Sequence, residues 1–117
     1  MIDVEEYFAR YEESPWDCAS GLLWPKDFTS GEFGREHDAF LAMVNPSQDH
    51  IDYWKAAEEH RDTIAHFMVQ LGEFRGREHE IPDNFAVILE NGELKDGFHR
   101  LTAAKLLGLQ SLPATPA

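Results

Sequence analysis

The sequence predicts a small α+β domain in which a short mixed sheet and a C-terminal hairpin-turn-helix segment are packed by N-terminal helices. Residues 35–71 carry apolar side chains at helical spacing, interrupted at Asn45-Pro46. Residues 85–95 hold an extended apolar run, an Asn91-Gly92 pair and a return segment, which together are typical of a β-hairpin. A chain of 117 residues has the usual size of one domain, so we assign residues 1–117 to a single domain.

Three helices are expected in the first 71 residues. One runs from Asp3 to Tyr11, with Asp3 as its N-cap. Residues 12–34 contain two prolines and three glycines and are expected to be irregular, apart from a short strand at 21–24. Helices then follow at 35–44 and 47–71, with Ser47 as the cap of the second and Gly72 as its stop.

The C-terminal third is expected to form a strand at 85–90, a type I′ turn at Asn91-Gly92 and a second strand at 93–95. Asp96-Gly97 then turns the chain into a helix at 98–107 that Gly108 ends. Residues 109–114 are expected to form a short edge strand. Arg75 and Arg77 belong to a basic turn before the hairpin, either solvated or reaching a bound phosphate.

The net charge restricts the partners that the protein can have. The chain carries 22 acidic and 10 basic side chains, a net charge of −12, and its 12% aromatic content argues against a disordered chain. Residues 1–71 hold 15 acidic and 5 basic side chains, whereas residues 72–117 hold 7 and 5. Long polyanions and anionic membranes are therefore repelled, so neither non-specific nucleic-acid binding nor membrane binding is expected. Any anion chemistry belongs to the C-terminal third.

Cysteine and histidine usage excludes several kinds of site. Cys18 is the single cysteine, so no intramolecular disulfide and no multi-cysteine zinc site can form. No two of the six histidines have the i, i+3 or i, i+4 spacing of paired ligands on a helix, and we expect no metal site made by the protein alone. The N-terminus lacks the features of a signal peptide, and no apolar run could span a membrane. A cytoplasmic protein is expected.

The turn at Asp96-Gly97 has the features of an anion site. The first turn of a helix offers backbone N–H groups without intrahelical partners, and a glycine lets a ligand approach the backbone. His99 and Arg100 lie in this same turn, where a cation is unfavourable unless an anion is nearby. The alternative is an ordinary strand-to-helix connection with Arg100 in a surface ion pair.

The segment around this turn resembles the signature of the ParB/sulfiredoxin-like superfamily. The resemblance covers about residues 85–114 and is carried by Asp96-Gly97-Phe98-His99-Arg100-Leu101-Thr102-Ala103-Ala104, Leu106-Leu107-Gly108-Leu109 and Leu112-Pro113. It implies a small α+β fold that binds nucleotide phosphates at the start of the motif helix.

Specific roles follow from the resemblance. It implies that Gly97 and the backbone of Phe98 and His99 cradle phosphate, and that Arg100 neutralises it. His99 would touch a phosphoryl oxygen or donate a proton, and Asp96 would cap the turn or orient a metal ion. The implied cofactor is ATP or CTP, with Mg²⁺ held by phosphate oxygens and carboxylates. His99 and Arg100 would be the catalytic residues of an NTPase or of a phosphotransferase acting on a small acceptor.

Two departures from the superfamily narrow the function. Sulfiredoxin chemistry needs a cysteine immediately before the His-Arg pair, where this chain has Phe98. Partitioning proteins carry a DNA-binding helical domain after the module, whereas this chain ends at Ala117. A stand-alone, minimal member that binds a nucleotide is therefore expected.

The sequence is also compatible with two other functions. The acidic N-terminal helices would suit a phage-type or plasmid-type accessory or inhibitor protein that binds a basic or nucleic-acid-binding partner. A ParB-like nuclease would instead need a local basic patch to meet its substrate. That patch would comprise Arg75, Arg77, Lys95, Arg100 and Lys105.

Overall fold

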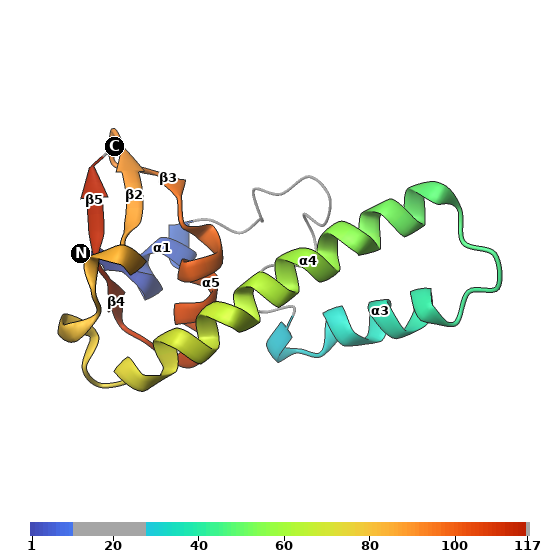
Figure 1. Cartoon of the computed structure of the whole chain (residues 1–117), viewed down its shortest axis with the longest axis horizontal. Helices are drawn as coiled ribbons and strands as arrows, with labels where there is room; N and C mark the ends of the chain where they lie inside the picture. Colours follow the sequence, from blue (N-terminus) through green and yellow to red (C-terminus); the bar gives the residue numbers. More distant parts are fainter. Residues whose placement is uncertain (11–27, 117) are drawn as a thin grey trace. The chain divides into compact units, whose positions relative to one another are not determined.

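The computed structural model describes residues 1–10 and 28–116, and the strand expected at 21–24 lies outside this range. The described residues form a small α+β structure with four α-helices and two short sheets, one of them mixed (Figure 1). The chain divides into two compact units, Met1–Tyr11 with Thr63–Ala117 and Glu12–Asp62. The assignment of residues 1–117 to one domain stays a prediction.

The first unit contains both sheets. β2 (Val87–Glu90) pairs with β3 (Glu93–Asp96) in antiparallel fashion and with β5 (Ala114–Pro116) in parallel fashion, giving the order β3-β2-β5 (Figure 1). β1 (Ile2–Asp3) pairs with β4 (Ser111–Leu112) in a separate two-stranded sheet. The three-stranded sheet is the short mixed sheet that the sequence predicts.

The β2–β3 hairpin forms where it was predicted. Glu90 pairs with Glu93 across a two-residue loop in which Asn91 has φ 54° and Gly92 has φ 78°. Two positive φ values are what a type I′ turn requires, and asparagine and glycine tolerate them best. β2 begins two residues later than expected because Asp83–Phe85 form a 3-10 turn, closed by an N–H···O bond from Ala86 to Asp83.

The single edge strand expected at 109–114 is instead two strands. Pro113 separates β4 from β5, and its carbonyl accepts a 3.0 Å hydrogen bond from the Val87 N–H. Because proline has no N–H to donate, it breaks the ladder, and the chain passes at this point from one sheet to the other.

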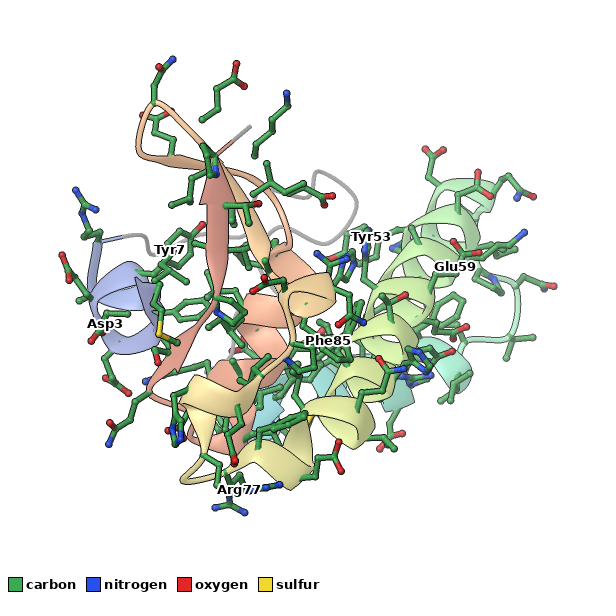
Figure 2. The ribbon with its side chains drawn as sticks, turned by 60° about the vertical axis from the view of Figure 1, so that its left-hand side comes forward. Asp3, Tyr7, Tyr53, Glu59, Arg77 and Phe85 are labelled. Carbon is green, nitrogen blue, oxygen red and sulfur yellow. The ribbon has the colours of Figure 1, made fainter. Side chains whose placement is uncertain are left out.

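Two helices of the first unit have the capping that the sequence predicts. In α1 (Val4–Arg10), the Asp3 carboxylate accepts a 2.8 Å hydrogen bond from the Glu6 N–H, so Asp3 is the N-cap (Figure 2). α5 spans Phe98–Leu107 and ends at Gly108, whose φ is 78°. Both boundaries of α5 agree with the prediction, because glycine at each end adopts a backbone conformation that other residues avoid.

The core of the first unit is built around α5, in which five of ten residues are buried. Thr102 is fully buried on this helix, and its hydroxyl has no hydrogen-bond partner within the described part of the chain. The buried apolar residues of this unit are Val4, Ile64, Leu71, Ile81, Ala86, Val87, Phe98, Leu101, Ala103, Ala104, Leu109 and Leu112.

The second unit contains a helical hairpin. α3 (Glu32–Leu41) begins and ends three residues before the predicted 35–44 helix. It starts early because Gly31, with φ 80°, serves as its N-cap, and it ends before the Asn45-Pro46 restriction is reached. α4 (Gln48–Leu71) has the predicted end, and Ser47 accepts a 3.2 Å hydrogen bond from the His50 N–H as its cap.

Aromatic side chains hold this hairpin together. Trp54 of α4 stacks on Phe40 with ring centroids 5.7 Å apart and meets Phe33 edge-on at the same distance. The imidazole of His37 on α3 lies 2.7 Å from the Glu58 carboxylate of α4. Residues 63–71 of α4 belong to the first unit. None of the described helices is long and apolar enough to span a membrane.

Candidate functional site

The candidate site is the turn that joins β3 to α5. Gly97 has φ 107° and is the N-cap of the helix, and its carbonyl accepts a 2.9 Å bond from the Leu101 N–H. The Asp96 carboxylate accepts a 2.8 Å bond from the Gly97 N–H, so it stabilises the turn. Because the cap is a glycine, no cap side chain provides an acceptor for the first-turn N–H groups of α5.

Gly97 lies directly against β2. A Cβ atom at this position would lie 2.8 Å from Val87 Cγ1 and 3.0 Å from Val87 Cα. Both the positive φ and this close approach require a glycine. The fold therefore accounts for Gly97 whether or not a ligand binds, which the sequence pattern alone could not show.

Phe98 has its side chain in the core. It is 6% exposed, and its ring centroid lies 6.4 Å from that of Tyr7 and 6.2 Å from that of Phe8, both on α1. These edge-on contacts pack α1 against the start of α5. Only the backbone of Phe98 could face an anion at the helix start.

Arg100 is held by two contacts inside the first unit. Its Nη1 donates a 3.0 Å hydrogen bond to the Ala86 carbonyl, and its guanidinium carbon lies 5.3 Å from the ring centroid of Phe67. Its Nε is buried and has no hydrogen-bond partner among the residues that the structure describes. Ala86 and Phe67 were not predicted as neighbours of the motif, because neither carries a chemical signal in the sequence.

The other basic side chains of the C-terminal third have acidic neighbours. Lys95 lies 3.6 Å from Glu90, and Lys105 forms an ion pair with Glu5. Arg77, which is labelled in Figure 2, pairs with Glu80 at 3.1 Å and donates a 2.7 Å hydrogen bond to the Glu73 carbonyl. These contacts partly neutralise three of the five cations that a nuclease would need as a basic patch.

His99 lies in the first turn of α5 and is partly exposed. The structure thus places Asp96, Gly97, the Phe98 backbone, His99 and Arg100 in one turn, as their sequence order requires. Within residues 1–10 and 28–116, no group of three or more His, Cys, Asp or Glu side chains is arranged to hold a metal ion.

Comparisons with protein-family models, with curated proteins and with solved structures give no match to this chain. The site is therefore interpreted from its own geometry.

Proposed function

We propose that this protein binds the phosphate groups of a nucleotide at the N-terminus of α5, with His99 and Arg100 beside the anion. The observation that carries the proposal is the Nε of Arg100, the one atom of this guanidinium that is buried without a hydrogen-bond partner among the described residues. The Nη1 of the same side chain bonds the Ala86 carbonyl. A buried donor without an acceptor costs about 1–3 kcal/mol, so an oxyanion that accepted a hydrogen bond from Nε would recover this free energy.

The helix start supports the same proposal. α5 has ten residues and a glycine cap, so its dipole and first-turn N–H groups favour an anion. A guanidinium on this turn can supply two parallel N–H···O bonds to a phosphate. The sequence of the C-terminal third has a net charge of only −2, which makes a single phosphate group more acceptable than a long polyanion.

Calorimetry with ATP, CTP, ADP and GTP in the presence of Mg²⁺ tests the proposal. We expect at least one nucleotide to bind, and Arg100→Ala to weaken binding by about 10- to 100-fold because charge-assisted hydrogen bonds are lost. Arg35→Ala on α3 is the charge-matched control and should bind like the wild type. Absence of heat from all four nucleotides, or equal affinity in folded Arg100→Ala, would refute phosphate binding at this turn.

Phosphate release from the same nucleotides measures whether the protein also hydrolyses them. If His99 transfers a proton, His99→Gln should retain nucleotide affinity within about twofold and lose phosphate release. Binding without phosphate release in the wild type would make the protein a nucleotide-binding module rather than an NTPase.

A further inference from the structure

We propose that the tip of the α3–α4 hairpin is a docking surface for a partner protein that presents apolar side chains surrounded by lysine or arginine. The tip comprises residues 41–51, from the end of α3 to the first turn of α4. It shares no residue with the turn at Asp96-Gly97, so this proposal does not depend on phosphate binding.

Large apolar side chains are concentrated at the tip. Val44 is 91% exposed, Leu41 63%, Met43 42% and Ile51 38%. Isolated exposed apolar residues are common on protein surfaces, but a group of them at one end of a hairpin favours an interaction site, because a partner that covers them releases ordered water.

The packing of the hairpin does not bury these side chains. Its buried cluster consists of Phe33, Trp54 and Ala57, with Phe28, Phe40 and Tyr53 packed around it. Phe40, the neighbour of Leu41 in sequence, stacks on Trp54 and is the last α3 residue in this cluster. After Phe40, α3 ends at Leu41 and α4 begins at Gln48, and no residue of 41–51 belongs to this cluster.

A groove on the same hairpin adds polar recognition. It has a volume of about 530 Å³ and is lined by Glu36, Ser47, Asp49, His50, Tyr53 and Trp54. Carboxylates beside the half-buried Tyr53 ring suit a lysine or arginine side chain, which can form an ion pair and lie against the ring. The groove therefore fits a basic residue that flanks the apolar contact.

The negative charge around the tip indicates which class of partner binds there. Residues 28–62 contain eight acidic and three basic side chains, so a second copy of this chain would bring the same negative charge to the contact. Anionic lipid surfaces and nucleic acids are repelled for the same reason. A partner with apolar side chains and a basic rim satisfies both the exposed apolar residues and the acidic surroundings.

Binding of a labelled amphipathic helical peptide of lysine and leucine to the full chain, followed by fluorescence anisotropy, tests the proposal. Leu41→Ser/Val44→Ser should weaken binding by about tenfold, since two apolar side chains leave the contact. Val69→Ser is the control for loss of an exposed apolar side chain, because Val69 is 83% exposed on α4 but lies outside the tip. It should bind within about twofold of the wild type.

The acidic contribution is tested with a second pair of variants. Glu36→Gln/Asp49→Asn should weaken binding and reduce its dependence on salt, whereas Asp83→Asn/Glu93→Gln, which removes the same charge elsewhere, should have a smaller effect. A lysine–serine peptide should bind at least about tenfold more weakly than the lysine–leucine peptide.

Several outcomes would overturn the proposal. These are no binding of the lysine–leucine peptide, equal binding by the tip and Val69 variants, or equal binding of the lysine–serine peptide. Strong binding to phosphatidylserine vesicles, or a dimer in sedimentation that Val44→Ser abolishes, would assign the tip to a membrane or to a second copy of the chain.

Discussion

The turn at Asp96-Gly97 and the tip of the α3–α4 hairpin differ in how much their residues contribute to the packing of the fold. At the turn, Gly97 packs against Val87, Phe98 is in the core and Arg100 bonds the Ala86 carbonyl. At the tip, Val44 and Leu41 are mostly exposed. A substitution at the turn therefore changes stability together with any binding, whereas a substitution of Leu41 or Val44 can change binding alone. Two of the four predictions below concern the turn and the tip, and the other two concern the helices α5 and α4 beside them.

The largest effect is expected for Gly97→Ala. The new Cβ would lie 2.8 Å from Val87 Cγ1 at a φ of 107°, so we expect a loss of about 3 kcal/mol in the free energy of unfolding from strain and overpacking. Gly92→Ala is the control, because Gly92 has φ 78° but no atom within 4 Å of the new Cβ, and it should cost about 1 kcal/mol. Urea denaturation of both variants measures the difference. Equal losses would mean that the contact with Val87 is unimportant.

Thr102→Val should stabilise the first unit. The Thr102 side chain is fully buried and its hydroxyl has no hydrogen-bond partner in the described part of the chain. Replacing the hydroxyl by a methyl group of similar size should raise the free energy of unfolding by about 1 kcal/mol. Thr115→Val on β5, where the residue is exposed, should change it by less than about 0.5 kcal/mol. A destabilised Thr102→Val would show that the hydroxyl has a partner after all.

Ser47→Ala probes local structure at the tip. Loss of the 3.2 Å bond from the His50 N–H should cost about 1 kcal/mol of stability, while Ser47→Asp should retain the cap. Asp3→Ala removes the equivalent cap of α1 and should have a loss of about the same size. Thermal unfolding followed by circular dichroism compares the three variants. A Ser47→Asp variant as unstable as Ser47→Ala would contradict the capping role.

The smallest effect concerns the pH dependence of α4. Partial burial lowers the pKa of His60 below its ordinary value, against the opposing influence of Glu59. The unfolded chain therefore takes up a proton at higher pH than the folded chain, and stability should fall as pH decreases below about 6.5. His60→Gln should reduce this loss between pH 7 and pH 5, as measured by urea unfolding at each pH. An unchanged pH profile would exclude His60 as a contributor.

Local signals in the sequence predicted the C-terminal segment well. The Asn91-Gly92 turn and both ends of α5 were predicted because glycine and asparagine adopt positive φ at low cost. The 109–114 strand was predicted as one element because its partners could not be known. β4 and β5 belong to different sheets, and only long-range pairing with β1 and β2 separates them at Pro113.

The side-chain environment of the site could not be predicted in the same way. The sequence placed Arg100 one turn into a helix that begins at a glycine, but gave no indication of the Ala86 carbonyl or of the Phe67 ring beside it. Likewise, the helical spacing of residues 35–71 indicated two helices without showing that the side chains between them stay exposed. Both features depend on contacts between residues that are distant in the sequence.

By itself, the sequence determined the α+β class, the glycine-capped motif helix and the concentration of negative charge in the first 71 residues, because these depend on local backbone preferences and on composition. Only the tertiary structure decided that the contact with Val87 requires a glycine at position 97, that the Arg100 Nε is buried without an acceptor among the described residues, and that Leu41 and Val44 at the hairpin tip stay mostly exposed. The physical reason is that burial and hydrogen-bond satisfaction are set by which distant segments come into contact, and no local pattern encodes that.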